Sequence, residues 1–269
     1  MLPKTNTDPS RWIALALCTF SSFAIPSAGK SSTRIVHVFV ALADNQHQGI
    51  IPVPPVLGNG RDPQRNLYWG AAYGVKTYFK ASKDWELVWS GRGEKDVILE
   101  RCIFKSRMND VYLVADAYEG SQIKQAVTDF FSAAAGVAKE KVSFKMRSEA
   151  VSIAIAGDAD LVGYIGHDAF MDFQIPPIAA AKGDKPRQTI ILACASKAYF
   201  APYIRQTEAE PLLWTTGLMA PEAYTLKAAL DSWIAHEDDE AIRRRAAQAY
   251  DRFQKCGARA ALRFFATNW

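Results

Sequence analysis

Two short apolar runs, each followed by one reactive side chain, decide the fold: DLVGYIGHDAFMDF at residues 160–173 and QTIILACAS at residues 188–196. The first run ends at His167 and the second at Cys194. Apolar runs of this length, bounded by Gly and polar residues, are typical of buried parallel strands. In an open α/β sheet, ligands bind at the carboxyl ends of such strands. We therefore expect the two side chains to face each other across a cleft, as a thiol nucleophile and its base require.

Each of these residues has a simpler interpretation when it is taken alone. A Cys after an apolar strand is more often a small buried residue. A His at a strand end is more often a structural residue held by hydrogen bonds. It is their occurrence on successive strand ends that predicts a catalytic pair.

The order of these elements resembles the core of the caspase, gingipain, clostripain and legumain group of cysteine peptidases. The residues YIGH at 164–167 resemble the gingipain-type His motif, and ILACAS at 191–196 resembles the Cys-bearing strand end. As a pattern of elements, the similarity extends from about residue 34 to residue 233. It implies a caspase-like three-layer fold, catalysis by His167 and Cys194, and a peptide or protein substrate.

The residue after the His departs from that group. A Gly usually follows the His there, and its backbone N–H helps to bind the oxyanion, whereas Asp168 follows His167 here. An Asp backbone can still donate, but its carboxylate would repel a developing negative charge. We expect backbone donors near Gly166, Asp168 and Cys194. Asp172 is placed either to orient His167 or to cap a turn.

The remaining strands and helices predict an α/β three-layer sandwich, with a mostly parallel sheet flanked by helices. The apolar segments expected in that sheet are Arg34–Ala43, Val111–Ala115, Leu161–Ile165, Ile190–Ala193 and Leu212–Thr216. Residues 85–89 and 97–105 predict a hairpin beside it. Helices are expected over residues 66–79, 123–135, 196–205 and 221–235, with one long amphipathic helix over 240–265. Residues 149–156 fit a strand or a helix equally well.

Polar side chains at other strand ends provide further candidates. We assign Asp44 and Asp116, with Gly166 and Asp168, to oxyanion and substrate binding. A metal-dependent hydrolase is a second hypothesis, because Asp44, Asp116, Asp168, His47 and His167 are suitable ligands for zinc or manganese. A compact spacing such as HExxH is absent from the sequence. We therefore favour the His–Cys hydrolase and expect no metal or cofactor.

Two further alternatives concern the pair itself. A non-catalytic α/β binding protein is the third hypothesis, and Asp168 in place of Gly is its best evidence. His236 is a rival base, since it follows Cys194 in the chain as the base does in hydrolases with a nucleophile elbow. It lies in the charged stretch HEDDE, which favours solvent exposure. A helix that starts at Ser196 would place Cys194 near its N-terminus, where the dipole favours a thiolate.

Composition excludes several classes of partner. The chain has 269 residues, of which 49% are hydrophobic, so it can build one large core. The net charge is +4 and no dense basic tract occurs, so nucleic acid is not expected as a partner. The turn after residues 111–115 has neither a GxGxxG nor a P-loop pattern, which gives nucleotide binding little support.

The first residues predict a targeting segment. Lys4 and Arg11 form a basic start, residues 12–25 are mostly apolar, and small residues follow at 27–29. This pattern predicts a signal peptide over residues 1–29, an α/β domain over 30–269, and a periplasmic or secreted protein. The apolar part is short for a membrane span, so none is expected after processing. Three cysteines would then remain, an odd number that leaves at least one thiol unpaired or paired between chains.

Export yields a direct prediction. The mature chain isolated from its native host should begin near Lys30 and lie outside the cytoplasm, because the segment before it is removed. N-terminal sequencing of the fractionated protein measures this. An intact Met1 on soluble cytoplasmic protein would contradict it.

Overall fold

The computed structural model describes Met1, residues 33–183 and residues 186–269, so the expected signal peptide lies outside the described residues. The strands are β1 (Arg34–Ala41), β2 (Trp85–Gly91), β3 (Ile98–Ser106), β4 (Val111–Tyr118), β5 (Lys139–Met146), β6 (Glu149–Ala156), β7 (Leu161–Ile165), β8 (Gln188–Leu192), β9 (Glu210–Thr215) and β10 (Phe265–Ala266). The helices are α1 (Val75–Ala81), α2 (Ile123–Ala134), α3 (Ser196–Thr207), α4 (Ala223–Ile234), α5 (Asp239–Gln254) and α6 (Ala258–Phe264). Two short 3₁₀ helices, η1 (Gly120–Gln122) and η2 (Ala169–Met171), complete the elements.

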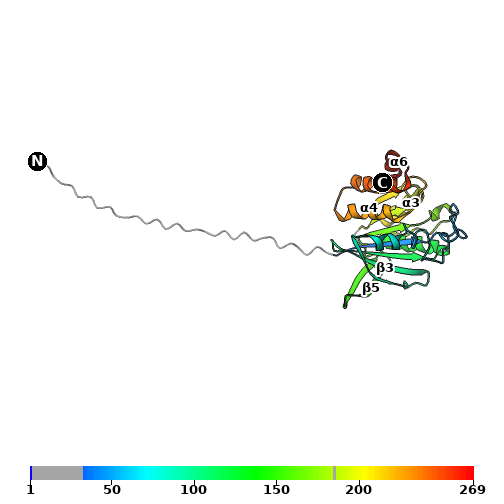
Figure 1. The fold of residues 1–269 in the computed structure, drawn as a ribbon, viewed down its shortest axis with the longest axis horizontal. Coiled ribbons are helices and arrows are strands. Elements are labelled where there is room, and N and C mark those ends of the chain that lie inside the picture. Colours follow the sequence, from blue (N-terminus) through cyan, green and yellow to red (C-terminus); the bar gives the residue numbers. More distant parts are fainter. Residues whose placement is uncertain (2–32, 184–185) are drawn as a thin grey trace. The chain divides into compact units, whose positions relative to one another are not determined.

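The main sheet has eight strands in the order β10-β9-β8-β7-β1-β4-β3-β2 (Figure 1). Its five central strands, β9, β8, β7, β1 and β4, are parallel to one another. These are the five segments expected from the sequence, so the mostly parallel sheet is confirmed. β2 and β3 form the expected antiparallel hairpin at one edge, and β10 adds antiparallel to β9 at the other.

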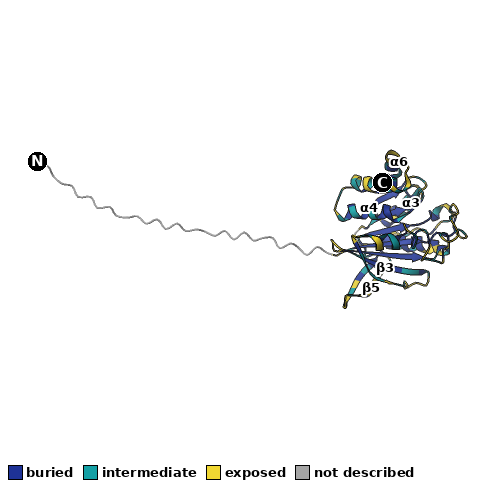
Figure 2. Cartoon of the chain, in the orientation of Figure 1, coloured by how far each residue is buried: buried dark blue, intermediate teal, exposed yellow. Residues whose placement is uncertain are grey.

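Alternate side chains of β1 divide the core into two layers. Val36, Val38 and Val40 pack with residues of α1, α4 and α5. Ile35 and Phe39 pack with α2, α3 and the separate β5–β6 hairpin. Both faces of the sheet are therefore covered, which is why its strands read as continuous apolar runs. Figure 2 shows these strands in the colour of buried residues.

Two helical expectations were wrong. Only α1 is helical within residues 66–79, because Asn66 pairs with the end of β1 instead. Its side chain accepts from the Ala43 N–H at 3.0 Å and donates to the Ala43 carbonyl at 2.8 Å. The long helix over 240–265 is broken into α5 and α6, where Lys255 has a φ of 54° and Gly257 a φ of 89°. Both values are left-handed and end a right-handed helix. The ambiguous residues 149–156 form β6.

A buried charge network connects adjacent strands. Arg101 of β3 donates to both carboxylate oxygens of Asp116 in β4, each at 2.6 Å. His37 of β1 lies 3.0 Å from Asp116, while its Nδ1 accepts from the Ala156 N–H of β6 at 3.1 Å. Its Nε2 therefore carries the proton and donates to Asp116. Burial alone would raise the pKa of Asp116, but the hydrogen bonds from Arg101 and His37 lower it below its ordinary value.

Removing one partner of the Arg101–Asp116 pair should strongly destabilise the fold. Arg101→Ala leaves Asp116 buried without its cation and should reduce the free energy of unfolding by about 3–5 kcal/mol. Arg107→Ala is the control, because the Arg107–Glu86 pair is exposed and is expected to contribute within about 1 kcal/mol. Urea unfolding at neutral pH measures both, and equal losses would contradict the expectation.

Candidate active site

The pairing of β7 with β8 positions the two candidate catalytic residues. The last residues in register are Ile165 and Leu192, and His167 and Cys194 each follow two positions later. The ladder continues one step further, since the Gly166 N–H donates to the Leu192 carbonyl at 3.3 Å. Neighbouring strands lie about 4.8 Å apart. Both side chains therefore leave the sheet at the same carboxyl edge.

His167 and Cys194 line one cavity of about 300 Å³. Its walls come from loops at the carboxyl ends of the strands around β8. One wall follows β1, another follows β7, and the third connects β9 to α4. The other lining residues are Gly49, Ile50, Ile51, Pro52, Val53, Leu67, Tyr68, Gly166, Met171, Leu218, Met219, Ala220 and Pro221.

His167 is held in a defined orientation. Its Nε2 lies 2.9 Å from Oδ2 of Asp172, which also accepts from the Gly49 N–H at 3.0 Å. Asp172 thus orients the ring, one of the two roles its spacing suggested. A side chain at Gly49 would place its Cβ 2.5 Å from Oδ1 of Asp172, so this approach requires glycine. With the proton on Nε2, Nδ1 keeps a lone pair, and it has no hydrogen-bond partner among the described residues.

Cys194 is half-buried, and its sulfur contacts the loop after β9. The Met219 N–H donates to Sγ at 3.4 Å, and Sγ lies 3.7 Å from the Met219 carbonyl. Burial raises the pKa of the thiol; the Met219 N–H opposes this effect and the charge of Asp168 adds to it. The expected thiolate was therefore wrong. Desolvation of the half-buried sulfur is the largest cause of the raised pKa.

Asp168 is fully buried and does not line the pocket. One carboxyl oxygen accepts from the Phe170 N–H at 3.0 Å and caps η2, while the other has no partner among the described residues. Burial raises the pKa of Asp168 to about 7; the Phe170 N–H works against this shift and the charge of Asp172 adds to it. The carboxyl group is therefore only partly charged at neutral pH. This weakens the repulsion that its position after His167 suggested.

The expected oxyanion donors differ in availability. The Gly166 N–H is occupied by the Leu192 carbonyl. The N–H groups of Asp168 and Cys194 donate to no other residue in the described part of the chain. Two of the three expected donors are therefore unpaired among the described residues.

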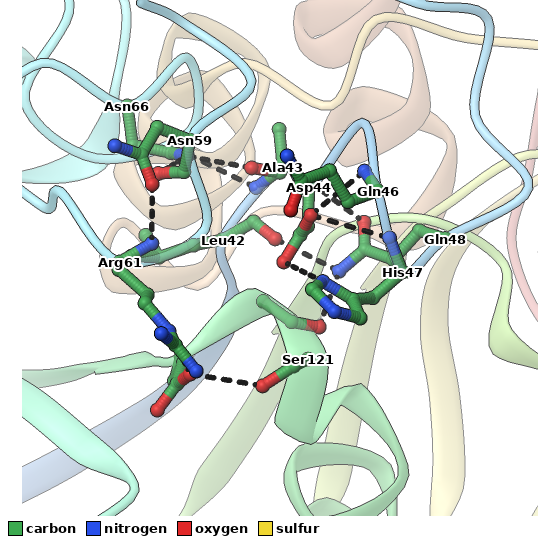
Figure 3. A network of polar contacts seen from close by, with 12 residues as sticks. Leu42, Ala43, Asp44, Gln46, His47, Gln48, Asn59, Arg61, Asn66 and Ser121 are labelled. Carbon is green, nitrogen blue, oxygen red and sulfur yellow. Dashed lines mark hydrogen bonds and ion pairs between the residues drawn. The ribbon is translucent and has the colours of Figure 1, made fainter.

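Asp44 and Asp116 lie outside this pocket. Asp44 contacts His47 at 2.9 Å and lines a separate polar cavity of about 420 Å³ with Asn59 and Arg61 (Figure 3). Asp116 is occupied by Arg101 and His37. The five donors of the metal hypothesis are thus divided among three places. Among residues 33–183 and 186–269, three or more His, Cys, Asp or Glu side chains nowhere gather where they could hold a metal ion.

The rival base lies at the opposite edge of the sheet. Arg34, at the start of β1, donates to the Ile234 carbonyl at 2.9 Å, so the end of α4 lies beside the amino end of that strand. His236 follows there and is exposed. It is therefore remote from Cys194. Cys102 is buried and Cys256 exposed, and these two and Cys194 are free thiols.

Met219 and Tyr68 had no sequence signal of a place at this site. Both lie in irregular segments, and only their position after β9 and β1, at the carboxyl edge, could have suggested it.

Comparisons with protein-family models, curated proteins and solved structures find no match to this chain. In the part of the chain that the structure describes, no helix has the length and apolar character to cross a membrane. The functional argument therefore rests on the geometry of the site.

Asp168 should make folding stability depend on pH. Its pKa is raised from 3.8 to about 7, so the folded state keeps a proton that the unfolded state releases. Its contribution to stability is full below about pH 4 and is lost as the pH rises through about 7. From pH 5 to pH 8, Asp168→Asn should gain stability relative to wild type, on the order of 1–4 kcal/mol.

Urea unfolding of both proteins at the two pH values measures this gain. Asp96→Asn, at an exposed position, controls for the change in net charge. The same pH dependence in wild type and Asp168→Asn would show that Asp168 is ionised throughout.

Proposed function

We propose that this protein is a cysteine-dependent hydrolase, acting on peptides, in which Cys194 is the nucleophile and His167 the base. One observation carries the proposal. Two residues far apart in sequence stand at equal distance beyond the last register pair of adjacent parallel strands, and both line one pocket. The resemblance to the caspase, gingipain, clostripain and legumain group supports it, and with it a caspase-like sandwich. The apolar run after the basic start of the sequence supports an exported location.

The contacts of His167 and Cys194 support a path for the proton. Because burial raises the pKa of the thiol, Cys194 is protonated before substrate arrives. Nδ1 of His167 takes this proton as sulfur attacks the carbonyl carbon, and Asp172 stabilises the imidazolium through Nε2. The N–H groups of Asp168 and Cys194 are placed to bind the oxyanion.

Two steps follow the attack: release of the amine and hydrolysis of the thioester. The C–N bond breaks, and the imidazolium returns its proton to the departing amine. Water attacks the resulting thioester, with His167 accepting a proton from it and giving one to the sulfur. Thiol, base and carboxylate return to their starting states.

A binding protein is the second candidate, and the raised pKa of the Cys194 thiol favours it. Acylation of the sulfur separates the two candidates. An activated ester, p-nitrophenyl hexanoate, should acylate Cys194, and mass spectrometry locates the acyl group. Cys194→Ala should lose this modification, and His167→Ala should slow it by about 100-fold or more.

Two controls use other residues of the chain. Cys256→Ser removes the exposed thiol, and His236→Ala removes the imidazole at the opposite edge; both should leave the rate at Cys194 unchanged. A Cys194 that reacts no faster than Cys256, and is unaffected by His167→Ala, would falsify the hydrolase proposal.

A further inference from the structure

The pocket around Cys194 offers an apolar surface to its ligand. None of its fifteen lining residues is Asp, Glu, Lys or Arg. Eight of them are aliphatic or Pro, and seven of these come from the segments at residues 49–53 and 218–221. The polar side-chain groups in the lining belong to His167, Cys194 and Tyr68. Apart from the catalytic pair, a ligand would thus meet mainly hydrocarbon.

The rim of the pocket is apolar as well. Ile51 is 82% exposed and Leu218 is 68% exposed, and Met171 is also exposed. These residues belong to three different loops that meet at this pocket. Exposed apolar side chains gathered around a cavity mark a ligand-binding surface.

The charged groups near the pocket do not line it. Asp172 is held by His167 and the Gly49 N–H. Asp168 is fully buried. At the same sheet edge, Asp44, His47 and Arg61 line the separate polar cavity (Figure 3). A charged substrate side chain would therefore lose its water in the Cys194 pocket without gaining an ion pair.

We infer that the substrate residue whose carbonyl is attacked bears a large uncharged side chain, such as Leu or Phe. This inference rests on the proposed function. Met219 fixes the wall at residues 218–221 beside the sulfur through its N–H, so this wall borders the acyl group that forms on Cys194. A cavity of about 300 Å³ is at the small end of ligand pockets, which suits one or two side chains.

Peptidyl-aminomethylcoumarin substrates that differ only in the residue before the scissile amide test the inference. For the full chain, kcat/KM should be about 10- to 100-fold higher with Leu or Phe than with Gly, because burial of the side chain stabilises the complex. Asp and Arg substrates should fall below Gly.

Variants at the rim provide a second readout. Ile51→Asp and Leu218→Asp should reduce kcat/KM for the Leu substrate by about tenfold and raise it for the Arg substrate. Met108→Asp is the matched control, because Met108 is 84% exposed and lies in the β3–β4 turn at the amino end of β4. It should leave both values unchanged.

The outcomes separate this inference from the proposed function. Equal rates for all substrates, or a preference for Asp or Arg, would overturn the inference and leave Cys194 catalysis standing. Acylation by the hexanoyl ester without cleavage of any peptide would overturn it in favour of a fatty acyl substrate. If the wild-type protein is neither acylated by the hexanoyl ester nor able to cleave any of the peptides, the proposed function itself is overturned.

Discussion

The parallel pairing of β7 with β8 is the constraint on which the site depends. Each strand contributes one reactive residue, and the register sets how far each lies beyond the sheet. A slip of one residue would displace one side chain relative to the other by about 3.3 Å and turn the strand faces over. Burial of both faces, with β7 entirely inside, opposes such a slip. The hydrophobic core thus holds the geometry of the proposed site.

The positions of the single strands and their burial could be predicted from the sequence. The five central strands are apolar along their whole length because helices cover both sides, so their pattern predicts them and their shared edge. Helix ends were harder to predict. The break between α5 and α6 depends on Gly257 and on Lys255 in a left-handed conformation. Gly257 is a possible helix end in the sequence, but the amphipathic spacing continues beyond it and therefore predicts one long helix.

Contacts between distant loops were beyond the sequence pattern. Burial raises the pKa of the Cys194 thiol, and the Met219 N–H that partly opposes this rise comes from the loop after β9, which no local motif announces. Asp172 orients His167, and the same carboxylate oxygen is held by the Gly49 N–H from the loop after β1. Both Cys194 and Asp172 thus have a hydrogen-bond partner in a different strand-end loop. Long-range packing, rather than propensity, determines the electrostatics of the site.

The hydrogen bond between Gly49 and Asp172 joins the pocket wall to the orientation of His167, the proposed base. One carboxylate oxygen accepts from both the wall and the imidazole, so a ligand that moves the loop must disturb the partner of His167. Occupancy and base alignment are therefore thermodynamically linked, and each biases the other by the same free energy. A well-fitting side chain would sharpen proton transfer as well as affinity. Substrates would then differ in kcat as much as in KM, and such a pattern is typical of induced fit.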